Sequence, residues 1–161
     1  TSVVNPDIVK VSLSIFLAEV LYRSIQEEES NSKLFEFLLN AIDQLNKTKE
    51  NIVNFHLVFM VQLSRFLGFL PAVQPSEKHC FFDKREGVFE AEKPNHPDWM
   101  EPHSTKLLNV LANRSFSDRM DINITPDQRH IMIEHLISYY KLHLDKMPDI
   151  KSHRVLQMVM N

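Results

Sequence analysis

The chain has 161 residues, of which 43% are hydrophobic and 24% charged, and its formal net charge at pH 7 is −3. This length and composition predict one globular domain with a hydrophobic core of its own and no second domain. Its two glycines, Gly68 and Gly87, are too few for a Gly-rich phosphate loop or a dinucleotide fingerprint. The negative charge argues against wrapping of nucleic acid, which depends on clustered Lys and Arg.

The sequence also indicates a cellular compartment. We find no apolar stretch long enough to cross a bilayer and no signal-type segment. The single cysteine, Cys80, permits no internal disulfide and agrees with a reducing environment. We therefore expect a cytosolic protein.

Apolar residues spaced by three and four predict a first helix over residues 7–28, most of it buried. Two neighbouring stripes carry this pattern: Ile8, Val11, Ile15, Ala18, Tyr22 and Ile25, and beside them Val9, Leu13, Phe16 and Val20. After the break at 30–32, a second helix places Leu34, Leu38, Ala41 and Leu45 on one face, with Phe35 and Ile42 alongside.

The most apolar stretch of the chain is "FHLVFMVQLSRFLGFLPAV", residues 55–73. Apolar side chains cover most of the circumference of this third helix, which predicts the centre of the core. We expect it to start near Thr48 or Lys49 and to stop at Gly68 and Pro71. Glycine tolerates a left-handed cap, and proline cannot continue the hydrogen-bond ladder of the helix. Because a buried guanidinium is costly, Arg65 should point to the rim, in a salt bridge or as an anion receptor.

Periodicity disappears over residues 71–101, where prolines accumulate. Within this insert, "HCFFDKREGVFEAE" predicts two short strands joined by a turn at 84–87. His79, Cys80, His96 and His103 could be assembled into a zinc site, but their spacing lacks a paired ligand signature, which favours histidines that face water. A helical metal-dependent hydrolase that uses His79, His96 and His103 remains the alternative from another class.

Two further helices and a short last one complete the prediction. A fourth helix follows from about Ser104, and "TPDQ" at 125–128 predicts a capping box that opens the fifth, which must end before Pro148. The short last helix carries Val155, Leu156 and Val159. The expected fold is mainly α: a single domain of about six helices with a small irregular or β-hairpin insert between the third and fourth.

Five stretches together resemble the RecO family of recombinational repair proteins, and specifically its Bacteroidetes-type members. The apolar third helix matches the family's hallmark helix, which ends in Leu-Gly-aromatic and then Pro. The short link between the first two helices agrees in order and spacing, as do three longer stretches: "SLSIFLAEVLYRSIQEEE", "FFDKREGVFEAEKPNHPDWMEP" and "ISYYKLHLDKMPDIKSHRVL". The resemblance implies that residues 1–161 are the family's C-terminal helical domain and that its N-terminal OB-fold half is absent from this chain.

The resemblance also implies a function. RecO acts as a non-enzymatic recombination mediator: it anneals complementary single strands and, with RecR, helps RecA to replace single-stranded DNA-binding protein on DNA. This domain would be a docking module in that process, in the bacterial cytoplasm and associated with the nucleoid. Some relatives hold zinc with four cysteines in the insert. Here Cys80 alone matches, so we expect neither metal nor cofactor, and packing of Phe81, Phe82, Phe89 and Trp99 in its place.

In some members of the family the helical half binds the acidic C-terminal tail of single-stranded DNA-binding protein with a basic residue near an apolar pocket. Arg65 is the nearest candidate here, and Arg23 is the second. Lys146, Lys151 and Arg154 belong to a modest basic cluster, with His153, that could contact DNA, while the missing half would supply most single-strand binding. No spacing defines a nucleophile with its base, so we expect no enzyme. A purely structural scaffold domain is the remaining alternative.

Overall fold

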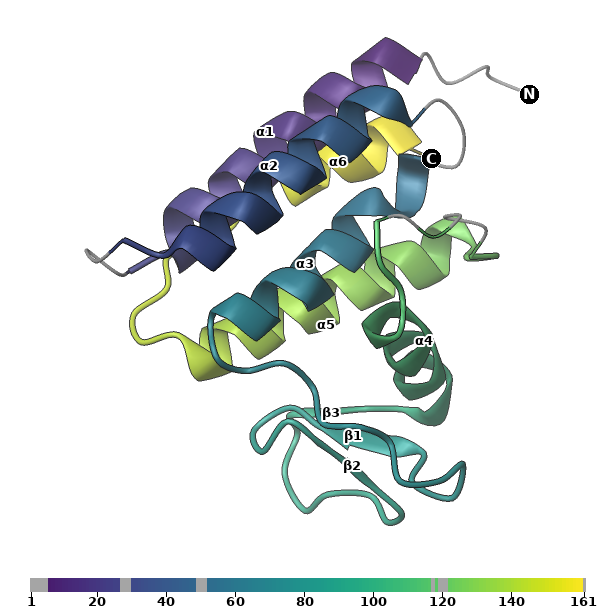
Figure 1. The fold of residues 1–161 in the computed structure, drawn as a ribbon. Coiled ribbons are helices and arrows are strands. Elements are labelled where there is room, and N and C mark those ends of the chain that lie inside the picture. The colour runs from purple at the N-terminus through teal and green to yellow at the C-terminus, as the bar shows by residue number, and fades with distance from the viewer. Residues whose placement is uncertain (1–5, 27–29, 49–51, 117, 119–121, 161) are drawn as a thin grey trace.

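The structure is a computed structural model that describes residues 6–26, 30–48, 52–116, 118 and 122–160. These residues form a mainly α domain with a small sheet between the third and fourth helices, as predicted (Figure 1). The helices are α1 (Pro6–Ser24), α2 (Ser32–Lys47), α3 (Phe55–Phe66), α4 (Pro102–Ala112), α5 (Pro126–His143) and α6 (His153–Met160), with a 3₁₀ turn at Ile52–Asn54 before α3. None of these helices is long and apolar enough to span a membrane.

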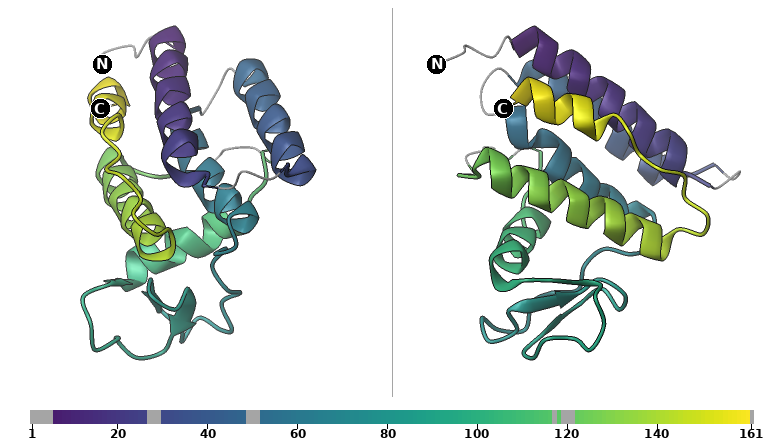
Figure 2. Two further views of the ribbon diagram at one scale, coloured as in Figure 1. Left: turned by 90° about the vertical axis from the view of Figure 1, so that its left-hand side faces the viewer. Right: turned by 180° about the vertical axis from the view of Figure 1, so that it is seen from behind.

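The helices are arranged in layers. α1, α2 and α6 lie over α3 and α5, while α4 and the sheet lie on the other side of that second layer (Figures 1 and 2). α1 makes its most extensive helix contact with α6, and α3 contacts α1, α2, α4 and α5. The C-terminal ends of α1, α3 and α5 lie at one end of the bundle, where α6 begins (Figure 1).

α3 is the centre of the core, as its apolar circumference predicts. Nine of its twelve residues are buried. The predicted start near Thr48 or Lys49 was wrong: Thr48 caps the end of α2, where its N–H donates to the carbonyl of Gln44, and α3 begins at Phe55. Gly68 follows α3 in the left-handed region, with φ 90°, which explains the stop at this point.

The prediction that most of α1 is buried was wrong for one of its two stripes. Val9, Leu13, Phe16 and Val20 are buried, whereas Ile8, Val11 and Ile15 are more than half exposed and Tyr22 is 82% exposed. α1 also ends at Ser24, four residues earlier than expected, and residues 27–29 lie outside the described part. α1 thus turns one apolar stripe to the core and the other to the surface.

Local capping explains two helix starts. The side chain of Asn31 accepts a hydrogen bond from the N–H of Leu34 at the start of α2. The capping box predicted for α5 is confirmed, because Thr125 and Gln128 each bond the other's backbone N–H. α4 begins at Pro102, two residues before the predicted start.

The insert contains a three-stranded antiparallel sheet in the order β2-β1-β3. β1 (Phe81–Asp83) and β2 (Val88–Glu90) form the predicted hairpin, with Phe82 opposite Phe89. β3 (Trp99–Met100), which was not predicted, pairs with the other edge of β1. The expected aromatic packing is present: the ring centroids of Phe82 and Phe89 are 5.1 Å apart, and those of Phe81 and Trp99 are 5.7 Å apart.

Candidate functional site

Arg65 lies in the last turn of α3, and its side chain is exposed. The sequence left two roles for it, an intramolecular salt bridge or an anion receptor. Its side chain makes no hydrogen bond or ion pair with any residue in the described part of the chain, so the salt bridge is not formed there. A cation at the C-terminal end of a helix also interacts favourably with the helix dipole. Arg65 is therefore a charged group at the rim, open to an external anion.

Arg23, the second candidate, is less available. It lies in the last turn of α1, where its Nε is buried and has no hydrogen-bond partner among the described residues. Its guanidinium carbon is 5.7 Å from the centroid of the Tyr22 ring. It also lies near the carboxylate of Glu19 and helps to lower the pKa of that group. Because α1 and α3 end on the same side of the bundle, the two candidate arginines belong to one end of the molecule (Figure 1).

The three candidate DNA contacts fall into two places. Lys146 lies in the loop after α5 with φ 52°, and its side chain is exposed. Lys151 lies two residues before α6 and Arg154 in its first turn, and both line a groove of about 540 Å³. His153, the fourth member of the predicted basic cluster, is not at the surface: its side chain is only 8% exposed and its Nε2 lies 3.0 Å from Glu134 Oε1.

That groove runs between α5 and α6, and we call it the α5–α6 groove. His130, Glu134, Ile137 and Lys141 line it from α5, Asp149, Ile150 and Lys151 from the segment before α6, and His153, Arg154 and Gln157 from α6. His130 and Gln157 also line a smaller neighbouring recess with His56, Arg129 and Ile133. Charged and apolar groups therefore lie together along these two helices.

His56, which lies in this recess, is a fully buried histidine on α3. Burial lowers the pKa of its imidazole to about 3, with a further contribution from the positive charge of Arg129. Its Nδ1 has no hydrogen-bond partner in the described part of the chain, and its ring packs edge-on against Phe16, with the ring centroids 5.8 Å apart. The imidazole is therefore neutral at physiological pH.

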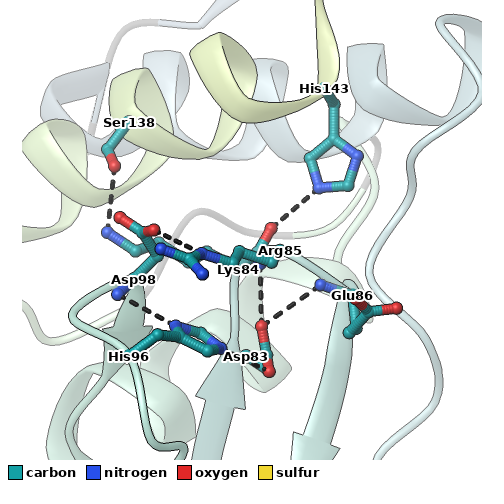
Figure 3. Close-up of polar contacts among 8 residues, drawn as sticks. All are labelled: Asp83, Lys84, Arg85, Glu86, His96, Asp98, Ser138 and His143. Atoms are coloured by element: carbon teal, nitrogen blue, oxygen red, sulfur yellow. Dashed lines mark hydrogen bonds and ion pairs between the residues drawn. The ribbon is translucent and has the colours of Figure 1, made fainter.

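A polar network joins the sheet to α5 (Figure 3). Lys84, at the turn after β1, is 6% exposed, and its Nζ donates to the hydroxyl of Ser138 at 3.0 Å. The Nε2 of His143 is 2.8 Å from the backbone carbonyl of Lys84. Burial lowers the pKa of Lys84, while Asp98 and Glu101 act in the opposite direction. The hairpin is thereby fixed to the middle and the end of α5.

Asp83 organises the turn itself (Figure 3). Its Oδ1 accepts from the backbone N–H groups of Arg85 and Glu86, and its Oδ2 lies 2.9 Å from His96 Nε2. Burial opposes ionisation of this carboxyl, but the hydrogen bonds from His96 and the two backbone groups outweigh it and hold its pKa below the ordinary value. The carboxylate thus closes the turn from three directions.

Both ring nitrogens of His96 are occupied. Nδ1 accepts from the backbone N–H of Asp98 at 3.2 Å, so the proton of the neutral ring is on Nε2, which donates to Asp83. The other two histidines of the hydrolase alternative lie apart from it, since His79 contacts Ser76 and His103 contacts Gln128. Among the residues that the structure describes, no three His, Cys, Asp or Glu side chains are grouped as a metal site would require.

Sequence reasoning missed the residues that hold this arrangement together. Glu19 on α1 accepts hydrogen bonds from the start of α6, and Lys84 is buried although lysine is rarely so. The local signal for Asp83 was present, because an Asp at the end of a strand commonly accepts from the next backbone N–H groups in a turn. No local signal points to Glu19 or Lys84, whose partners are far away in the sequence.

Comparisons of the sequence with known proteins identify a family. The family model described as "Recombination protein O C terminal" matches residues 5–153. The chain is 33% identical to the DNA repair protein RecO of Azobacteroides pseudotrichonymphae. The matched segment of 155 residues covers 96% of this chain and 64% of the relative. It is 34% identical over 157 residues to the DNA repair protein RecO of Flavobacterium psychrophilum, again covering 64% of the relative.

A further relative is the DNA repair protein RecO of Phocaeicola vulgatus, with 34% identity over 148 residues, 92% of this chain and 61% of the relative. The chain thus spans somewhat less than two thirds of the length of the curated relatives that it matches. No solved structure matches it significantly. A family model that covers nearly the whole chain, together with identities of this level, leads to one conclusion: the chain belongs to the family of recombination protein O C-terminal domains.

Proposed function

We propose that this domain is a non-enzymatic docking module of a RecO-type DNA repair protein in the bacterial cytoplasm. It acts with RecR and RecA, and with single-stranded DNA-binding protein, in strand annealing and in loading RecA onto DNA. Membership of the family supports this role, because the matched relatives are DNA repair proteins. An N-terminal OB-fold half outside this chain provides most of the contact with single-stranded DNA.

The observation that carries the docking proposal is the exposed guanidinium of Arg65 at the end of an otherwise buried helix, which has no side-chain partner among the residues that the structure describes. An acidic tail that ends in an apolar residue needs a cation for its carboxylates and an apolar surface for its last side chain. The ligand we propose for Arg65 is the C-terminal tail of the cognate single-stranded DNA-binding protein, with Arg23 at the same end of the bundle as a second contact. A contact of this size gives an affinity of about micromolar Kd and marked salt dependence.

The test is a titration of the labelled tail peptide, followed by fluorescence anisotropy. Arg65→Ala is expected to weaken binding at least about tenfold, which corresponds to the loss of one charge-assisted contact. Arg23→Ala should have a smaller effect because Arg23 is only half-exposed. Lys106→Ala, which removes an exposed cation from α4, is the matched control. Absence of binding by the folded wild type would favour the scaffold alternative, and binding unchanged by Arg65→Ala would remove Arg65 from the site.

For DNA, we propose only weak contact by this domain, through Lys146, Lys151 and Arg154. The net charge of −3 and the small number of clustered cations support a Kd weaker than about 10 µM at physiological salt. Submicromolar binding of an oligonucleotide that is lost on neutralising these three residues would contradict this part of the proposal.

A further inference from the structure

The outward stripe of α1 is an apolar helix face that stays exposed in the described part of the chain. It consists of Ile8, Val11, Ile15, Ala18 and Tyr22 and contains no charged residue. α1 lies between α2 and α6 in the outer layer of the bundle, so this stripe points away from α3 and α5 (Figure 2). A surface helix normally carries charged and polar residues on this side. α1 therefore has the sequence of a helix that packs on both sides.

The spacing of this stripe is that of a helix–helix seam. Its residues follow one another at intervals of three, four, three and four, which is the a and d pattern of a coiled-coil heptad. Between Ile8 and Tyr22 the seam runs for about 21 Å along α1. Such a seam is filled by side chains of another helix that insert between its own.

α2 continues the apolar surface with an exposed stripe of its own, made of Phe35, Leu39 and Ile42. At one end of the helix pair, Ile25 and Phe35 line the same pocket of about 490 Å³. At the other end, Lys10 Nζ donates to the backbone carbonyl of Asn46 at 3.0 Å. The two stripes therefore border one trough between the helices, and we call their eight side chains the α1–α2 face.

The area of the α1–α2 face matches one side of a stable protein–protein interface. Seven of its side chains are large and between 52% and 82% exposed. Together they expose roughly 800 Å², and each partner in an interface of standard size buries about 800 Å². Monomeric proteins rarely expose a contiguous apolar patch of more than a few hundred Å². The face is thus large enough for a stable contact with a second protein chain.

The stripe of α1 is also complementary to itself. When two copies of α1 cross antiparallel about a twofold axis between residues 16 and 17, Ile15 packs against Ala18 of the other copy. In the next layer Val11 packs against Tyr22, so a smaller side chain meets a larger one in both layers. A twofold contact uses the same residues from both copies. A second copy of this chain therefore supplies the surface that the face requires.

We propose that two copies of this chain associate through the α1–α2 face, with α1 packed antiparallel on α1 of the other copy and α2 flanking the contact. The inference goes beyond the proposed docking function and uses neither Arg65 nor the α5–α6 groove. The seam covers only two heptads and includes an alanine, so the expected dimer Kd is about 10 µM. At concentrations well below this Kd the chain is a single copy, and Ile15→Ser then has little effect on its stability.

The competing occupant of the face is a further part of a longer protein, because the matched relatives are longer than this chain. The heptad spacing and the self-complementary layers favour the second copy. The two occupants differ in what the intact chain does alone: only the second copy makes its mass depend on concentration.

The test is sedimentation velocity of the intact chain from about 1 to 300 µM, where the mean mass should rise from that of one copy toward that of two. Ile15→Asp places like charges on both sides of the twofold axis and should raise the dimer Kd at least about tenfold. Ile42→Asp should raise it at least about threefold. Ile131→Asp, which changes an exposed isoleucine of α5 outside the face, is the matched control and should leave the Kd unchanged. Circular dichroism verifies the fold of each variant.

A mixture of two variants tests the twofold arrangement itself. Ile15→Asp mixed with Ile15→Lys should associate more tightly than either variant alone, because opposite charges then meet beside the axis. Sedimentation as a single copy up to about 300 µM overturns the proposal and leaves the face to another occupant. Association that Ile15→Asp does not weaken also overturns it, and a mixture that associates no more tightly than its components overturns the antiparallel pairing of α1.

Discussion

The carboxylate of Glu19 on α1 accepts a hydrogen bond of 2.8 Å from the backbone N–H of Ser152, at the start of α6. The N–H of Lys151 and the hydroxyl of Ser152 donate to the same carboxylate. Helix N-termini leave N–H groups without partners inside the helix, and a side chain close in sequence normally satisfies them. Here the capping group comes from another helix. Burial opposes ionisation of the Glu19 carboxyl, but these hydrogen bonds outweigh burial, so the pKa of Glu19 is lowered.

Glu19→Ala is therefore expected to lower the free energy of unfolding by about 1–2 kcal/mol, the usual effect of removing a helix N-cap. Urea denaturation followed by circular dichroism measures it. Glu36→Ala, which removes an exposed carboxylate from α2, is the control and should change stability by less than about 0.5 kcal/mol. Equal effects of the two variants would mean that the contact with α6 adds nothing to stability.

The stability of the domain should fall as the pH is lowered from about 6.5 toward 3, because His56 is buried neutral. Its folded pKa of about 3 lies below the ordinary 6.5, so the unfolded chain takes up a proton in this window and the folded chain does not. One such group contributes about 1.4 kcal/mol per pH unit.

His56→Leu should reduce this slope by about 1 kcal/mol per pH unit on average between pH 5 and 6.5, because the unfolded imidazole is half protonated at pH 6.5 and almost fully protonated at pH 5. This window lies above the range in which Glu19, Asp83 and Glu101 take up protons. His135, whose pKa is also lowered chiefly by burial, remains in both proteins and cancels from the comparison. Urea denaturation at a series of pH values gives both slopes. Parallel curves for the two proteins would contradict a neutral buried His56.

Gly87→Ala should be more destabilising than Gly68→Ala, although both glycines have positive φ. A Cβ at Gly87 would lie 2.9 Å from the hydroxyl oxygen of Tyr139, whereas a Cβ at Gly68 would meet nothing within 4 Å. We expect a loss of about 1 kcal/mol for Gly68→Ala from the backbone alone and about 2–4 kcal/mol for Gly87→Ala. Thermal and urea unfolding measure the stability of both variants. Equal losses of stability would show that Gly87 and Tyr139 of α5 are not in close contact.

The two stripes of α1 should respond differently to substitution. Leu13→Ala removes a fully buried side chain and should lower the free energy of unfolding by about 2–5 kcal/mol. Ile15→Ser, on the stripe that faces outward, should change it by less than about 1 kcal/mol. A large loss for Ile15→Ser in this chain would mean that the outward stripe is covered.

The insert should fold without metal. Asp83, Lys84 and His96 already fix the hairpin by hydrogen bonds, and the rings of Phe82 and Tyr139 pack 5.5 Å apart between sheet and α5. The thermal midpoint should therefore be the same with and without EDTA, whereas loss of a structural zinc removes much of a small unit's stability. A large fall in the midpoint with EDTA, together with stoichiometric zinc in the untreated protein, would restore the metal alternative.

Features set by neighbouring residues were predictable from the sequence. The capping box of Thr125 and Gln128, the stop at Gly68 and the hairpin turn at 84–87 each depend on residues within a few positions of one another. The start of α3 was misplaced because apolar spacing continues through residues 52–54, where the backbone is a 3₁₀ turn. There the side chain of Asn54 donates to the carbonyl of Ile122 and accepts from Arg129, contacts that no local pattern reveals.

The buried stripe of α1 could not be chosen from the sequence for a related reason. Ile15 and Leu13 belong to equally regular apolar stripes, and the side that is buried depends on where α6 packs. The α5–α6 groove has the same origin: Lys141 and Lys151 are visible in the sequence as charges, but the two helices must be assembled before they share a surface. The sequence therefore identified Lys151 and Arg154 as candidate cations but did not predict the groove that they line.

The pairing of α1 with α6 also sets an order of events during synthesis. α1 leaves the ribosome early, but its main helix partner and the groups that hydrogen-bond to Glu19 are made only at residues 151–160. Contacts between segments so distant in the chain form late, and until then apolar surface stays open to other molecules. A stop codon or proteolytic cut shortly before residue 151 would leave α1 without its most extensive helix contact. Shortened chains are therefore expected to aggregate or to be degraded, even though α3, α5 and the sheet are complete.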